Sequence, residues 1–315
     1  MEKDRLVLDN ILFSDFSTLH TTDGQNTYTS YDFRTTADAR ISGFVQMSTV
    51  EIIFADQQNS CLRRFNRAEG SVYNFSGDCG QAGFRDGTDS LFDRPVSVIQ
   101  DNRSPHVLYV TDKKNLAVRM ITMSNKPYVT TLIRGNLGRL KYYAGMTQDS
   151  EGKYLYITYQ AGLERFDLVA NTSIDIISKR VGFGVQALLY DRNIGTIRDV
   201  VIYKRFIIMA DKKRHVLVAV DTAGNSSSTI CTGLRNSSYC HVDHPFSLLE
   251  VDGDLYVGGY RDISVLRGNT NYLIHLVNNL KMSFAERHGG AISFIQLQGK
   301  FPISVLVGEH SWIDC

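Results

Sequence analysis

One short pattern recurs six times along the 315 residues of this sequence. Each copy is a run of apolar and aromatic residues, and most copies end in an acidic or small residue. The copies read EIIFAD, VLYVTD, YLYITY, FIIMAD, DLYVGG and SVLVGE, and they begin at residues 51, 107, 154, 206, 254 and 304. The period is therefore about 50 residues, which indicates an array of similar supersecondary units.

Each copy has similar neighbours. Another apolar run precedes it, and a polar turn and a third run follow it, as in KKNLAVRMI after residue 112. Several copies add a fourth run, for example SVYNFSG and YVTTLIRG. Short runs rich in Val, Ile, Tyr and Phe between Gly, Asp and Asn turns predict strands, and no stretch keeps a helical period. Four antiparallel strands in each of six repeats predict an all-β protein, a six-bladed β-propeller.

The whole chain is expected to form this one domain. The last repeat ends at Cys315, near the start of its third strand, so we expect RLVLDNILF at residues 5–13 to supply the missing strand and close the ring. Closure removes exposed sheet edges, which otherwise promote aggregation. The expected blades span about 41–79, 83–135, 139–180, 188–233, 241–280, and 288–315 together with 5–13.

The second repeat carries the most specific motif. Gly83, Phe84, Asp86, Gly87, Phe92 and Pro95 precede VLYVTD, and Asn115 and Arg119 follow it. This spacing resembles an NHL repeat. The first repeat keeps the same offsets at Asp56, Asn59 and Arg63, whereas the later repeats lose the Asn and the Arg. The resemblance is strong over 41–135 and architectural elsewhere. Propellers of the low-density-lipoprotein-receptor type are a rival, because LYVTD is similar to their Tyr-Trp-Thr-Asp signature.

The cysteines form two local pairs. Cys61 opens a third strand and Cys79 follows the fourth, so antiparallel pairing brings them together, and Cys231 and Cys240 are the second expected disulfide. Reduced thiols in a cytosolic protein are the alternative. Cys315 has no expected partner in this chain, which suggests part of a longer protein. Four favourable glycosylation sequons also favour the secretory pathway, although the N-terminus MEKDRLVLDN is no signal peptide: Asn74, Asn171, Asn225 and Asn236.

Charge limits the partners. The chain has 34 basic and 33 acidic residues, a balance that argues against a nucleic-acid ligand. No apolar run is long enough to insert into a membrane. Basic residues gather in the turns and loops expected at one face of the ring, where they predict a rim that attracts an acidic protein or glycan. Ordinary solvated side chains are the alternative. These residues are Arg85, Arg94, Lys113, Lys114, Lys212, Lys213 and Arg214.

Three histidines support a second hypothesis. His244 and His288 hold equivalent places before the first strands of the last two repeats, and His241 lies close to His244. Three imidazoles at the channel mouth would suit zinc. Such a site resembles the six-bladed peptide-amidating lyases, with Tyr143 and Arg198 as the nearest catalytic partners. Calcium in the channel is a further option. The prediction favoured here is an extracellular recognition module without a cofactor, with a metal-dependent lyase or hydrolase as the alternative.

Overall fold

The computed structural model describes twelve stretches of the chain and two further short pieces. They are residues 28–32, 41–48, 50–66, 68–69, 71–135, 141–179, 187–232, 242, 244–251, 253–259, 263–266, 273–277, 291–295 and 303–305. The regular structure in them is entirely β, with no helix. Accordingly, this part of the chain contains no helix long and apolar enough to cross a membrane.

Four of the sheets have four antiparallel strands in chain order. The first holds β2 (Ile41–Gln46), β3 (Glu51–Asp56), β4 (Cys61–Asn66) and β5 (Ser71–Ser76). The second holds β6 (Pro95–Gln100), β7 (Val107–Asp112), β8 (Ala117–Thr122) and β9 (Tyr128–Arg134). The fourth holds β15 (Ile197–Tyr203), β16 (Phe206–Asp211), β17 (Val216–Asp221) and β18 (Ser227–Thr232). The fifth holds β19 (Ser247–Val251), β20 (Asp254–Gly258), β21 (Ile263–Leu266) and β22 (Leu273–Val277).

The third sheet has a fifth strand. Its first four strands are β10 (Tyr143–Gln148), β11 (Tyr154–Tyr159), β12 (Gly162–Asp167) and β13 (Thr172–Ser178). The added strand, β14 (Ala187–Tyr190), pairs in parallel with β13. The repeat pattern places residues 188–190 at the start of the fourth blade, but these residues extend the outer edge of the third sheet instead.

The last sheet joins the two ends of the described chain. Its order is β1 (Tyr28–Asp32), β23 (Ala291–Ile295) and β24 (Ile303–Val305), all antiparallel. An N-terminal strand does enter this sheet, but it is β1, and the predicted closing segment 5–13 lies outside the described residues. The order also differs from the repeat pattern, because β23 lies in the middle of the sheet, whereas the first strand of every other repeat lies at an end.

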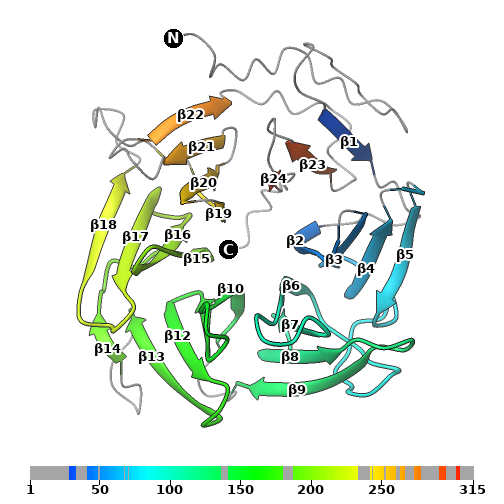
Figure 1. The fold of residues 1–315 in the computed structure, drawn as a ribbon. Coiled ribbons are helices and arrows are strands. Elements are labelled where there is room, and N and C mark those ends of the chain that lie inside the picture. Colours follow the sequence, from blue (N-terminus) through cyan, green and yellow to red (C-terminus); the bar gives the residue numbers. More distant parts are fainter. Residues whose placement is uncertain are drawn as a thin grey trace.

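The sheets are arranged in a ring, as in a β-propeller (Figure 1). In the first five sheets, the strands nearest the centre are β2, β6, β10, β15 and β19 (Figure 1). Two glycines let neighbouring inner strands approach closely. A Cβ at Gly43 would lie 2.4 Å from the Val96 carbonyl oxygen, and one at Gly145 would lie 2.5 Å from the Cα of Asp199. The inner wall is therefore packed backbone against backbone.

The core consists of apolar layers between successive sheets. The second strands β3, β7, β11 and β16 are buried at five of their six residues, because each is covered on both faces. Separate apolar clusters join the first sheet to the second, the second to the third, the third to the fourth and the fourth to the fifth. This regular burial explains why the repeated apolar runs predict the strands so well.

Candidate functional site

The motif of the second repeat forms a buried polar network. The Arg119 side chain is fully buried, and its Nη1 donates to Asp112 Oδ2 at 2.8 Å. Its Nη2 donates to Asp86 Oδ1 at 2.5 Å. Asn115 Nδ2 donates to the same Asp112 oxygen and to the Gly83 carbonyl, both at 2.8 Å. The motif residues therefore tie the loop before the sheet to the turn between β7 and β8.

Two further sheets carry a counterpart of this network. In the first sheet, Asp56 accepts from Asn59 Nδ2 and Arg63 Nε, each at 2.8 Å. In the third sheet, Tyr159 and Glu164 occupy the places of Asp112 and Arg119, as the strand registers show. Lys141 supplies the cation there, and its Nζ lies 2.8 Å from both Glu164 and Asp175. The repeat thus keeps a buried ion cluster while its residues change.

Tyr143, one of the two predicted catalytic partners, belongs to this third cluster. Its side chain is 1% exposed, and its hydroxyl donates to Glu164 Oε2 at 2.9 Å. Burial, followed by the Glu164 charge, raises the pKa of Tyr143 well above its usual value. The structure therefore places Tyr143 in the layer between sheets, and it does not line the central channel.

The central channel belongs to a cavity of about 1100 Å³ that is lined mainly by the inner strands. Arg198, the other predicted catalytic partner, lines it, and so does Asp199. Asp199 accepts from the backbone N–H of Val200 at 2.9 Å and of Leu248 at 2.8 Å, which links β15 to β19. Burial among the inner strands raises the pKa of Asp199 from 3.8 to about 6.

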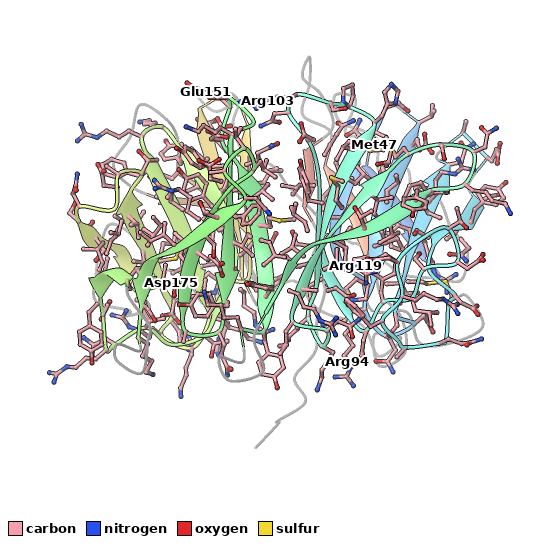
Figure 2. The ribbon with its side chains drawn as sticks, turned by 90° about the horizontal axis from the view of Figure 1, so that it is seen from below. Met47, Arg94, Arg103, Arg119, Glu151 and Asp175 are labelled. Carbon is pink, nitrogen blue, oxygen red and sulfur yellow. A yellow bond between two sulfur atoms is a disulfide. The ribbon has the colours of Figure 1, made fainter. Side chains whose placement is uncertain are left out.

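The two faces of the ring carry different loops (Figure 2). Arg94 marks one face, which holds the loops between sheets and the turns between second and third strands. Arg103 and Glu151 mark the other, which holds the turns between first and second strands. We call these the Arg94 face and the Arg103 face. Every basic residue of the predicted rim belongs to a loop or turn of the Arg94 face.

Backbone hydrogen bonds bring the cations of the second sheet together on the Arg94 face. The N–H of Lys113 donates to the Arg94 carbonyl at 3.4 Å, and the N–H of Lys114 donates to the Asp93 carbonyl at 3.0 Å. The exposed Arg94 has a positive φ of 55° and donates its N–H to Ser60 Oγ at 3.3 Å. Three of the predicted basic residues thus lie on one turn-to-turn contact.

Two more exposed arginines flank this contact. Arg85 lies in the loop before the sheet, where its Nε donates to the Asp89 carbonyl at 2.5 Å. Arg134, at the end of β9, lies over the Phe84 ring at 4.3 Å from the centroid. Asp86 and Asp112 are engaged by Arg119, so the carboxylates left in this loop are Asp78, Asp89 and Asp93. We call the five cations the second-sheet basic cluster: Arg85, Arg94, Lys113, Lys114 and Arg134.

The basic residues of the fourth sheet form a separate group. Lys212 donates its backbone N–H to the Thr196 carbonyl at 3.0 Å and lines the channel. Lys213 is exposed. Arg214 is only partly exposed and lies 3.8 Å from Asp191, so it helps to hold its own turn. The predicted rim is therefore divided between two turns, and its Arg214 is paired within the protein.

The histidine site is described only in part. His241 and His288 lie outside the described residues. The ring of His244 lies 3.8 Å, centroid to centroid, from that of His215, and the His244 N–H donates to His215 Nδ1 at 3.4 Å. Both residues have positive φ. The residues that the structure covers include no group of three His, Cys, Asp or Glu placed to hold a metal. The zinc and calcium sites stay predictions.

The first predicted disulfide is confirmed. Cys61 and Cys79 are bonded, with their Cα atoms 5.0 Å apart. Cys231 lies in β18, and Cys240 and Cys315 lie outside the described residues, so the second pair stays a prediction. Three of the four sequon asparagines are exposed on the outer part of the ring, at Asn74, Asn171 and Asn225, whereas Asn236 lies outside the described residues.

Comparisons with known proteins support the fold. No family model matches the chain, and no curated protein matches it. Solved β-propeller structures do. In a nidogen/laminin complex, the similar chain is 11% identical with a TM-score of 0.56, and the match covers 76% of this chain and 83% of that one. A protein of unknown function from Bacteroides thetaiotaomicron is 10% identical with a TM-score of 0.61, and the match covers 91% of this chain and 74% of that one. A streptogramin B lyase is 10% identical with a TM-score of 0.55, and the match covers 86% of this chain and 80% of that one. At these identities the likeness shows that the chain has a β-propeller fold.

Proposed function

We propose that this protein is an extracellular recognition module that binds an acidic protein segment or a sulfated glycan through its Arg94 face. It would be a six-bladed propeller of NHL type and part of a larger cell-surface or secreted protein. A rigid ring that carries the loops between its sheets on one face suits the display of binding residues. The nidogen neighbour was solved in complex with a protein, laminin, which is consistent with a propeller used for protein binding.

The second-sheet basic cluster is the observation that carries this proposal. Its cations come from three places in the sheet, and backbone hydrogen bonds fix two of the turns relative to each other. The neighbouring carboxylates Asp86 and Asp112 form ion pairs with Arg119, so they neutralise the basic cluster less than unpaired carboxylates would. A preorganised group of cations attracts a polyanion without the entropic cost of gathering mobile side chains.

The extracellular location rests on two observations. Cys61 and Cys79 form a disulfide, and such bonds persist mainly in oxidising compartments. The sequons at Asn74, Asn171 and Asn225 are exposed, as an acceptor for glycosylation must be. Enzymatic removal of N-glycans from protein secreted by cultured cells should therefore shift its mass.

Heparin and poly-glutamate are suitable probes for the binding face. We expect heparin, poly-glutamate or both to bind with an affinity that falls as salt rises. The triple change Arg94→Gln, Lys113→Gln and Lys114→Gln should weaken that binding at least tenfold. The matched control is Arg103→Gln with Lys126→Gln, which removes two exposed cations from the Arg103 face. If the control weakens binding as much as the triple change, or if neither probe binds, the proposal is wrong.

A further inference from the structure

The cavity extends from the central channel into a crevice between the third and fourth sheets. Tyr154, Tyr156 and Arg165 line it from the third sheet, and Ile202, Lys204 and Thr222 line it from the fourth. The turns that border it, at residues 149–153, 204–205 and 222–224, follow first or third strands, so the crevice opens towards the Arg103 face. It is thus separate from the second-sheet basic cluster.

Strand alternation explains why the aromatic and charged side chains meet there. Tyr154 and Tyr156 lie on the same side of β11, and Arg165 is the cross-strand partner of Tyr156 on β12. The Arg165 guanidinium lies over the Tyr154 ring at 4.7 Å from its centroid. Burial raises the pKa of Tyr156, while the nearby Arg165 acts against that shift. One wall of the crevice therefore combines two aromatic rings with a fixed cation.

The opposite wall and the floor come from the fourth sheet. Val200 is buried in the apolar cluster that joins the two sheets, and Ile202 and Tyr154 pack against that cluster. Lys204 and Arg205, both exposed, follow β15 at the mouth. The crevice therefore has an apolar base and two further cations at its opening.

The extra strand β14 packs against a turn that borders this crevice. A Cβ at Gly224, in the turn between β17 and β18, would lie 2.6 Å from Leu188 Cδ1 of β14 and 3.5 Å from Ile176. Leu189 of the same strand packs against the apolar cluster between the sheets. The parallel strand, which breaks the four-stranded pattern of the repeat, thus supports a turn that borders the crevice, while its own residues do not line the cavity.

The carboxylates of the cavity offset these cations only in part. Asp149 accepts the backbone N–H groups of Lys153 and Tyr154, at 2.6 and 2.8 Å, and Glu250 accepts that of Gly253 at 2.8 Å. Glu151 is exposed at the rim, and Asp199 accepts the backbone N–H groups of Val200 and Leu248. A negative group placed in the crevice would face Arg165, Lys204 and Arg205.

We propose that this crevice is a second binding site, and that it takes a small ring compound bearing a carboxylate. The ring would lie against Tyr154 and Ile202, and the carboxylate would accept hydrogen bonds from Arg165 and be attracted by Lys204. Aromatic faces bind flat rings and sugars, and a guanidinium beside them orients an anion. A sugar acid and an aromatic acid share this chemistry.

NMR titration of the whole protein tests the site with glucuronate and benzoate as probes. We expect one or both to bind, and glucose and benzyl alcohol, their uncharged counterparts, to bind at least tenfold more weakly. Arg165→Gln should weaken binding of the acid at least tenfold, and Lys204→Gln should weaken it severalfold without altering the packed wall. Binding of glucuronate alone identifies a sugar site, and binding of benzoate alone an aromatic one.

Arg64→Gln is the matched control. Arg64 holds the same place on β4 as Arg165 on β12 and lies over a tyrosine ring, at 5.8 Å from the Tyr73 centroid. It lines no part of the cavity. The proposal is overturned if neither acid binds, if the uncharged counterparts bind equally well, or if Arg64→Gln weakens binding as much as Arg165→Gln. Arg165→Gln should change heparin or poly-glutamate binding far less than the triple change on the Arg94 face does, so the two sites are tested separately.

Discussion

Lys141 shows how one residue can replace a motif. In the first two sheets an arginine on the third strand meets an aspartate at the end of the second strand. The third sheet has Glu164 at the arginine position, and Lys141, which precedes β10, forms ion pairs with both Glu164 and Asp175. A search for the motif alone would find the cluster missing, although the buried charges are still paired.

Lys141→Met should lower the free energy of unfolding by about 3 kcal/mol, because it leaves two buried carboxylates without their cation. Denaturant unfolding at pH 7 measures this loss. Adding Glu164→Gln to Lys141→Met should restore part of the stability, since one of the buried charges is then gone. Lys153→Met, which removes an amine lying over the Tyr154 ring, should cost far less. Equal losses for the two lysines would contradict this account.

Asp199 should make stability depend on pH. Its pKa is raised in the folded state, from 3.8 to about 6, so folding favours the protonated carboxyl. The resulting stabilisation is complete below about pH 4 and is lost as the pH rises through 6. Between pH 4 and 7, Asp199→Asn should change the pH dependence of the unfolding free energy by about 2–3 kcal/mol. Denaturant titrations at several pH values measure this, and an unchanged pH dependence in the variant would contradict this account of Asp199.

The sequence predicts the positions of the strands well, but it predicts poorly which strands pair with each other. The runs at 51, 107, 154 and 206 begin strands at those same residues, because burial on both faces demands continuous apolar residues. Nothing in ALLY at 187–190 indicates that it pairs in parallel with β13. Likewise, RLVLDNILF is a more apolar run than YTSYD, yet the observed partner of β23 is β1.

The candidate sites follow the same division. The sequence predicts Arg94, Lys113 and Lys114 as candidates, because residues before a first strand and residues after a second strand fall on the same face of a propeller. The sequence does not predict that Arg134 belongs to the basic cluster, because this depends on where β9 ends relative to Phe84. The crevice residues Tyr154, Tyr156 and Arg165 look like ordinary strand residues. The alternation of aromatic and apolar residues on β11 predicts that Tyr154 and Tyr156 lie on the same side of the strand. Which side faces the cavity depends on how the fourth sheet packs against the third, and the sequence does not predict that packing.

The contact between inner strands should be sensitive to a single methyl group. Gly145→Ala would bring its Cβ to 2.5 Å from the Asp199 Cα and 2.9 Å from the Arg198 carbonyl oxygen. Backbone atoms cannot move aside as side chains do, so β10 and β15 would have to separate. We expect a loss of about 1–3 kcal/mol in unfolding free energy, which thermal and denaturant unfolding would detect. Unchanged stability would show that the inner strands are not closely packed.

The whole ring depends on a contact between distant parts of the chain. β1 pairs with β23 over five residues, and without it β23 would present an open edge. Removal of residues 1–32 should therefore lower the melting temperature and promote association between molecules. Size-exclusion chromatography and thermal unfolding measure these effects. Removal of residues 1–27, which keeps β1, is the control, and equal behaviour of the two shortened proteins would contradict a closing role for β1.

The pairing of β1 with β23 also sets the order of events during synthesis. A ribosome releases β1 first, and the first five sheets can form from neighbouring strands as they emerge. β1 must wait until β23 appears, near the other end of the chain. Such a contact carries a large loop-closure entropy and is slow to form. The nascent protein would therefore pass through an incomplete ring whose two ends are not yet joined. We expect chaperones to bind the protein at this stage.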